Sequence, residues 1–155
     1  MGNSATAAVT FGASTESVGA TRVQVEARAF EFLIDEPESL GGTDEGPNPV
    51  EYLLGSLGGC LSIVGHVVAA EMDLEVATLS IDLDGDLDPG KFLGNADEER
   101  AGFQTIRASI DAELLTADGE PVDPAVKDEW LARTEDRCPV SDNLSAETPL
   151  EIEVE

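Results

Sequence analysis

The sequence predicts an α+β fold in which antiparallel sheets pack on one long central helix. Segments in which apolar and polar residues alternate, the pattern of half-buried strands, lie before and after a long apolar stretch with helical periodicity. Two shorter helical segments follow near the C-terminus. The 155 residues suffice for one core, and no repeat or linker divides them, so residues 1–155 are predicted to form a single domain.

The N-terminal part predicts strands. Residues 6–11 fit a first strand, and residues 12–19 are rich in turn formers. Residues 22–34 alternate for most of their length, which predicts a strand with one buried face. The alternation breaks between Ala27 and Phe30, and this break predicts a β-bulge.

A long helix is predicted from Pro49 to about Met72. Asn48 fits the N-cap, Pro49 fits the first helical position, and Glu51 stands three residues after the cap, as in a capping box. Apolar residues then form two stripes, so the helix must be buried on most sides, by a sheet and by another helix or subunit. The first stripe holds Leu53, Leu57, Cys60, Val64 and Val67, and the second holds Leu54, Leu61 and Val68.

The same helix contains glycines near Cys60, at Gly55, Gly58 and Gly59. Each glycine weakens a helix by about 1 kcal/mol relative to alanine. Close backbone packing around Cys60 is the compensation we expect.

The C-terminal half predicts two long strands, at residues 76–87 and 103–114, with a turn at Asp118-Gly119. One helix begins after Asp123 as N-cap and runs to about Glu135, and a second runs from Cys138-Pro139 to Leu144. Residues 149–154 alternate and are predicted to close a sheet edge.

The charge balance is strongly acidic, with 33 acidic and 8 basic residues and a net charge of -25. A net negative charge of this size excludes nucleic-acid binding, and an anionic membrane surface would repel the protein. The acidic residues are dispersed along the whole chain. Molar salt would shorten the Debye length to about 3 Å and so screen most of the repulsion between them. The composition therefore predicts a protein of a salt-rich, halophilic cytoplasm. The alternative is an acidic docking surface for a basic partner.

Neither a membrane span nor a secretory signal is expected. The most apolar region, residues 52–70, is interrupted by glycines, serines and His66. No basic segment followed by an apolar core opens the chain. We therefore expect a cytoplasmic protein, where a disulfide would be transient and catalytic.

The two cysteines, Cys60 and Cys138, are the candidates for thiol chemistry. Cys60 lies in the middle of the long helix, whereas Cys138 lies at a helix start beside Arg137. A thiol becomes a useful nucleophile when a cation or a helix N-terminus lowers its pKa. The alternative is that both are unrelated buried thiols that pack as small hydrophobes.

Other chemistry finds less support. Cys60, His66 and Cys138 suggest a zinc site, but His66 lies six positions after Cys60, whereas helical ligand pairs usually lie four positions apart. No glycine-rich phosphate loop is present. No metal or cofactor is predicted, and Trp130 and Tyr52 are expected to be packing residues.

Three segments together resemble the OsmC family, which includes the organic hydroperoxide resistance proteins. They are GGTDEGPNPVEYLLGSLGGC from Gly41 to Cys60, RAGFQTI from Arg100 to Ile106, and RCPVS from Arg137 to Ser141. The resemblance extends from about Arg22 to Val154. It implies an intertwined homodimer with the first-cysteine helix at its centre and two active sites at the subunit interface.

The resemblance also implies chemistry. Cys60 would be the peroxidatic thiolate, which attacks the O–O bond of an organic hydroperoxide and becomes a sulfenic acid. Cys138 would be the resolving thiol that forms a disulfide with it. A dithiol reductant of the lipoyl type would restore both thiols.

The sequence departs from the family at the activating residues. The hydroperoxide-resistance branch has an arginine from the N-terminal strands and a glutamate directly after the Asn-Pro pair. Val50 holds that glutamate position here, and Glu51 follows, about 180° around the helix from Cys60. The resemblance therefore implies Arg22 as the activator, with Arg28 as runner-up, and Glu51 as either a catalytic residue or only a helix cap.

Two functions follow from the sequence. The first is a thiol-dependent peroxidase that reduces organic hydroperoxides with two cysteines. The alternative is a non-catalytic dimer of the same fold, which senses redox state or binds a small hydrophobic ligand. Fast oxidation of Cys60 by peroxide distinguishes the first from the second.

Overall fold

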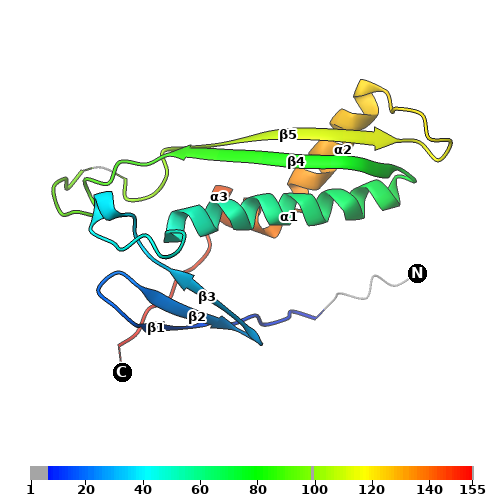
Figure 1. Cartoon of the computed structure of the whole chain (residues 1–155). Helices are drawn as coiled ribbons and strands as arrows, with labels where there is room; N and C mark the ends of the chain where they lie inside the picture. The colour runs from blue at the N-terminus through cyan, green and yellow to red at the C-terminus, as the bar shows by residue number, and fades with distance from the viewer. Residues whose placement is uncertain (1–6, 99, 155) are drawn as a thin grey trace. The chain divides into compact units, whose positions relative to one another are not determined.

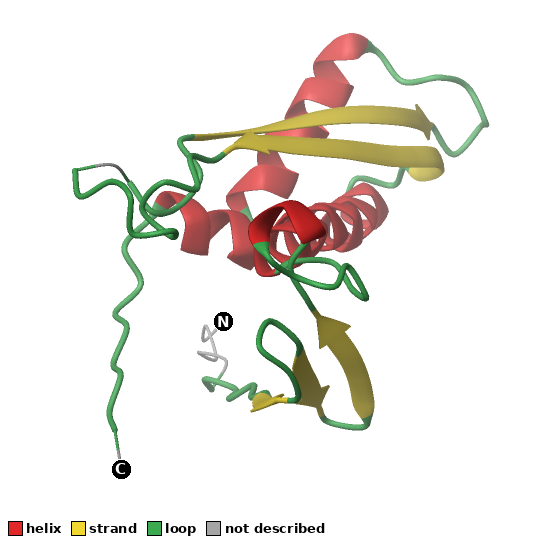
Figure 2. Ribbon diagram, turned by 60° about the vertical axis from the view of Figure 1, so that its left-hand side comes forward, coloured by secondary structure: helices red, strands yellow, loops and turns green. Residues whose placement is uncertain are grey.

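The structure, a computed structural model, describes residues 7–98 and 100–154. It confirms the α+β class, with antiparallel sheets and three α-helices (Figures 1 and 2). The chain divides into two compact units, Met1–Tyr52 and Leu53–Glu155. Each unit is described separately, and the single domain remains a prediction.

The first unit contains a sheet of three antiparallel strands in the order β1-β2-β3. These are β1 (Ser14–Ser17), β2 (Val23–Ala27) and β3 (Phe30–Ile34). The predicted bulge is wrong, because Ala27 pairs with Phe30 across a two-residue turn. Arg28 has φ 59°, a left-handed conformation that reverses the chain here.

The first predicted strand is also wrong for residues 7–11, which form no strand; residue 6 lies outside the described residues. The strand lies instead at Ser14–Ser17, within the segment predicted as turns. All four of its residues are exposed, and they pair with Val23–Glu26 of β2. Backbone pairing alone defines this strand, so no apolar alternation marks it in the sequence.

A buried carboxylate organises the loop between β3 and the long helix. Asp35 is 0% exposed and accepts five hydrogen bonds. The hydroxyls of Thr21 and Thr43 donate at 2.7 and 2.6 Å, and the backbone N–H groups of Glu36, Thr43 and Glu45 donate at 2.8, 3.2 and 3.1 Å. The two hydroxyls contribute most to holding the pKa of Asp35 far below its usual value. Asp35, directly after β3, thereby ties the turn before β2 to the loop that leads to α1.

The long helix, α1 (Pro49–Glu71), begins where the sequence predicts. The Glu51 N–H donates to Asn48 Oδ1 at 2.9 Å, and the Asn48 N–H donates to Glu51 Oε2 at 2.8 Å. These reciprocal bonds complete the predicted capping box. Tyr52, the last residue of the first unit, packs on the ring of Phe32 and donates its hydroxyl to the Leu33 carbonyl.

The second unit places α1 along a two-stranded sheet (Figures 1 and 2). Its strands are β4 (Glu75–Asp86) and β5 (Thr105–Leu115), followed by α2 (Pro124–Asp136) and α3 (Pro139–Ser145). These elements agree with the sequence prediction. One core cluster joins α1, β5 and α2 through Val68, Ala69, Ala112, Leu114 and Trp130.

The glycines of α1 fall on two different faces. An added Cβ would meet Leu83 Cδ1 at 2.7 Å from Gly58, and Trp130 Cζ2 at 2.9 Å from Gly65. Gly55 and Gly59 have nothing within 4 Å of an added Cβ. The inner face therefore needs glycine for close packing, whereas the outer face of α1 is open in the second unit.

That outer face is apolar. Ile63 is 69% exposed and Val67 is 45% exposed. By length and composition alone, α1 would qualify as a membrane span, the one such helix among the described residues. Six residues of α1 are buried, and the helix packs against the sheet. Core packing therefore explains part of its apolar character.

The final predicted strand is wrong: residues 149–154 form no strand. Leu150, Ile152 and Val154 are 82%, 80% and 97% exposed. Alternation marks a segment that can pair, but these residues have no strand partner in the described part of the chain.

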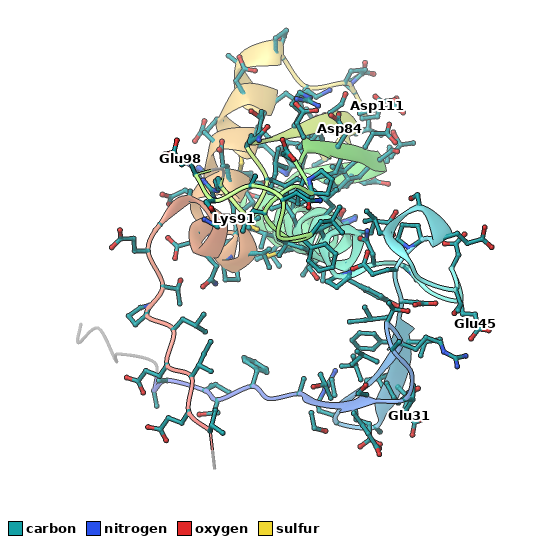
Figure 3. All side chains as sticks on the ribbon, turned by 90° about the vertical axis from the view of Figure 1, so that its left-hand side faces the viewer. Glu31, Glu45, Asp84, Lys91, Glu98 and Asp111 are labelled. Carbon is teal, nitrogen blue, oxygen red and sulfur yellow. The ribbon has the colours of Figure 1, made fainter. Side chains whose placement is uncertain are left out.

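Acidic side chains extend from many elements of both units. Figure 3 labels examples at Glu31, Glu45, Asp84, Glu98 and Asp111, all of them exposed. The charge is a property of the whole surface rather than of one tail.

Candidate two-thiol site

The second unit brings the two cysteines together. Cys138, 1% exposed, forms a buried cluster with Leu57 and Leu61 of α1, and Cys60 packs against this cluster. The Cys138 side chain lies close enough to the Cys60 thiol to raise its pKa. Cys60 is half-buried, and both cysteines are free thiols. Residues distant in the chain therefore form one dithiol site.

The start of α3 positions the sulfurs. Cys138 is the N-cap of α3, followed by Pro139, and its Sγ accepts the Ser141 N–H at 3.4 Å. The backbone of Val140 hydrogen-bonds to the Cys60 thiol. One helical turn thus directs backbone groups at both sulfurs. The Cys-Pro pair predicted the helix start, whereas the pairing with Cys60 was implied by the family resemblance and not by any local spacing.

The environment within this unit opposes ionisation of Cys60. Burial contributes most to raising the pKa of the Cys60 thiol, and the hydrogen bond with Cys138 raises it further. The Val140 backbone acts in the opposite direction. Among the described residues, no cation contributes to this balance. A reactive thiolate would therefore need a cation from elsewhere.

Arg137, next to Cys138, is already engaged. It donates from Nη1 to Glu71 Oε2 at 2.5 Å and from Nη2 to Glu71 Oε1 at 3.1 Å. Glu71 ends α1, about 16 Å along the helix axis from Cys60 at 1.5 Å per residue. The pair holds the α3 end of the chain against α1 and leaves Arg137 committed to a carboxylate.

The other predicted residues, Arg22 and Glu51, lie in the first unit. Arg22 donates to Glu45 Oε2 at 2.6 Å, and this hydrogen bond raises the pKa of the guanidinium. Glu51 is held in the capping box of α1. No sequence pattern identifies Glu45 as the partner of Arg22, because the two residues are far apart in the chain.

The remaining candidates have ordinary surroundings. Arg28 lies over the ring of Phe30, with its guanidinium carbon 5.1 Å from the ring centroid. His66 is exposed on α1. Within the described residues, no group of three or more histidine, cysteine or acidic side chains is placed to hold a metal ion.

A cavity of about 700 Å³ lies in the second unit, beside the two-thiol site. Leu57, Leu61 and Leu144 line it and also pack around Cys138. Its polar lining includes Arg100 and Glu135. Arg100 has neither an ion pair nor a hydrogen bond among the described residues, although the chain carries 33 acidic residues.

Comparison with known proteins identifies relatives. The sequence profile of the family described as OsmC-like protein matches residues 42–153. No curated protein sequence matches the chain.

Solved structures share the fold at low sequence identity. An OsmC-like protein from Mycoplasma pneumoniae has a TM-score of 0.73 and 16% identity, with 88% of this chain and 87% of that chain covered. An organic hydroperoxide resistance protein from Elizabethkingia anophelis gives 0.65 and 17%, with 90% of each covered. The organic hydroperoxide resistance protein OsmC from Legionella pneumophila gives 0.63 and 18%, with 90% and 92% covered.

Proposed function

The chain belongs to the OsmC-like protein family, and from that premise we propose that it is a thiol-dependent peroxidase that reduces organic hydroperoxides. The observation that carries this proposal is the contact between Cys60 and Cys138 at the start of α3. Cys138 is buried among leucines and the half-buried Cys60 packs beside it, and disulfide formation would account for this adjacency. Two structural neighbours bear the name organic hydroperoxide resistance protein.

The cycle uses each cysteine once. The Cys60 thiolate attacks one oxygen of the peroxide, the O–O bond breaks, and the alcohol leaves as Cys60 becomes a sulfenic acid. The Cys138 sulfur then attacks the Cys60 sulfur and water leaves, giving a disulfide. A dithiol of the lipoyl type returns both cysteines to thiols. The apolar side chains around the site favour an organic hydroperoxide over hydrogen peroxide.

The cation that activates Cys60 is Arg22 in this proposal, with Arg28 as runner-up. Arg22 has a fixed carboxylate partner, Glu45, whose backbone N–H is bound to Asp35. An arginine held in this way keeps one orientation while retaining further donors. Of the two roles open to Glu51, catalytic residue or helix cap, its bonds in the capping box support the cap, and Glu45 is the carboxylate that orients Arg22 in this proposal.

A homodimer is part of the proposal, with both units contributing to one domain of the family fold. The open face of α1, with Gly59, Ile63 and Val67, offers an apolar surface on which a second helix can pack closely. Free thiols and dispersed acidic charge are consistent with a reducing, salt-rich cytoplasm.

Stopped-flow oxidation in molar KCl tests the proposal. The reduced wild type should react rapidly with cumene hydroperoxide and more slowly with hydrogen peroxide. The reaction should vanish in Cys60→Ser and stop at the sulfenic acid in Cys138→Ser. Oxidation no faster than that of a free thiol would reject the peroxidase.

A second candidate function is ligand binding, which the cavity lined by Arg100 favours. Its apolar walls, and a guanidinium that has no carboxylate partner among residues 7–98 and 100–154, suit an amphipathic carboxylate. Titration with a saturated medium-chain fatty acid, which carries no peroxide, distinguishes this function from catalysis. Binding that weakens in Arg100→Gln but not in Arg133→Gln would support it, and no binding would reject it.

A further inference from the structure

The two sulfurs of the site differ in how far each can be reached. Cys138 is 1% exposed and is covered by Leu57, Leu61 and Leu144, whereas Cys60 is half-buried. Any hydroperoxide that oxidises Cys60 must reach its sulfur, so the proposed function itself requires a path to Cys60. Cys138 needs no path to the peroxide, because in the proposed cycle it reacts only with the sulfur of Cys60.

We propose that the reductant attacks the Cys60 sulfur of the disulfide, so that the mixed disulfide forms on Cys60 and Cys138 departs as the thiolate. This inference rests on the two-cysteine cycle proposed above. Thiol–disulfide exchange depends on which sulfur is accessible and on how well the other sulfur leaves. Both factors favour the same direction here.

The leaving group is stabilised at Cys138. The Ser141 N–H lies 3.4 Å from Cys138 Sγ and can donate to the developing thiolate. Attack on Cys60 places the departing charge on the Cys138 sulfur, which this N–H reaches directly. Release of Cys138 rather than Cys60 is therefore the easier bond cleavage.

The electron balance closes with one dithiol. Its first thiolate bonds to Cys60 Sγ as the Cys60–Cys138 bond breaks, and the Cys138 thiolate takes up a proton. Its second thiolate then attacks the dithiol's own sulfur in the mixed disulfide and releases the Cys60 thiolate. The dithiol leaves as a cyclic disulfide: it has given two electrons to the protein, and of its two protons one is taken up by Cys138 and one goes to solvent.

The test is to locate the mixed disulfide. The protein is oxidised separately with cumene hydroperoxide and with diamide, then mixed in molar KCl with 2-mercaptoethanol. Acid stops the exchange at early times, and peptic peptides are mapped by mass spectrometry. The adduct is expected on the peptide that carries Cys60, and an adduct mainly on the Cys138 peptide would overturn the inference.

Single-cysteine variants give a second measurement. Cys138→Ser and Cys60→Ser each react with a disulfide reagent that releases thionitrobenzoate, first folded and then in urea. Folded Cys60 should react about 100-fold faster than folded Cys138, and the two rates should converge in urea. Similar rates in the folded proteins would contradict the access argument.

The two oxidants separate the inference from the proposed function. Slow reaction with the hydroperoxide, followed by a Cys60 adduct after diamide, rejects the peroxidase and supports the direction of exchange. Failure of both oxidants to form the disulfide overturns the inference, because the thiols would then be out of reach.

Discussion

The indole N–H of Trp130 donates to the carbonyl oxygen of Gly65 at 2.8 Å and fixes α2 against α1 in the second unit. Trp130 is 1% exposed, and its ring lies where a side chain at position 65 would be. This contact positions α2, and α2 leads into the turn that carries Cys138. The stability of the dithiol site therefore depends on a glycine five residues from Cys60.

Gly65→Ala should destabilise the protein by about 1–3 kcal/mol, because the added methyl group overlaps Trp130 Cζ2. Urea unfolding followed by Trp130 fluorescence measures the change. Gly55→Ala is the matched control, since its Cβ meets nothing within 4 Å and alanine favours the helix by about 0.5–1 kcal/mol. Equal stability of wild type and Gly65→Ala would contradict the packing argument.

The low pKa of Asp35 leads us to expect that the first unit loses stability at acidic pH, an acid limb in the plot of its unfolding free energy against pH. Its folded pKa lies far below the unfolded value of about 3.9, so the folded state binds the proton less readily. The stabilisation is present above the unfolded pKa and is lost as the pH falls through the folded pKa. Asp35→Asn should remove part of this dependence in urea titrations between neutral and low pH.

Thr43 supplies the control for that measurement. Thr43→Ser keeps the hydroxyl that donates to Asp35 at 2.6 Å, and it should preserve the acid limb. Thr43→Val loses the hydroxyl and should weaken it. An acid limb that survives Asp35→Asn unchanged would assign it to other carboxylates.

Arg22 predicts the pH dependence of Cys60. Because burial raises the pKa of Cys60 in its own unit, loss of the activating cation should raise it further. Arg22→Gln should shift thiolate absorbance to higher pH and slow peroxide reduction about tenfold or more at neutral pH. Glu45→Gln should have a smaller effect of the same sign, because Arg22 would lose the carboxylate that holds it in one orientation.

Arg28→Gln is the comparison for Arg22→Gln. Arg28 stacks on Phe30 and should leave the Cys60 profile unchanged if Arg22 is the activator. A shift in Arg28→Gln alone would move the activating role to Arg28.

Ile63 predicts the subunit contact. It is 69% exposed on the open face of α1, and a charged side chain there would be buried without a partner in a dimer. Ile63→Glu should therefore dissociate the dimer, as measured by sedimentation velocity in molar KCl. Phe92→Glu, a change at an exposed apolar residue outside α1, should leave it intact. A monomeric wild type would end this proposal.

The net charge of -25 predicts dependence on salt. Self-repulsion should lower the urea midpoint sharply at low KCl, and molar KCl should restore it by shortening the Debye length to about 3 Å. A midpoint independent of KCl would favour an acidic docking surface for a basic partner instead.

The sequence alone determined the elements whose signals are local. Asn48 and Glu51 defined the start of α1, Cys138-Pro139 defined the start of α3, and alternation defined β4 and β5. Caps and periodicity depend on residues a few positions apart, so they can be read from the chain.

Strand pairing was predicted less well. Ser14–Ser17 forms a strand without an apolar face, and residues 149–154 alternate without forming one. A strand exists only when another backbone pairs with it, and that partner is not written in its own residues.

The tertiary structure alone decided the chemistry of the site. It brought Cys60 to Cys138, gave Arg22 the partner Glu45, and divided the glycines of α1 between a packed and an open face. These contacts join residues distant in the chain, and they form only when whole elements pack. Local sequence therefore determined where the helices begin, and the packing of those helices determined which side chains meet.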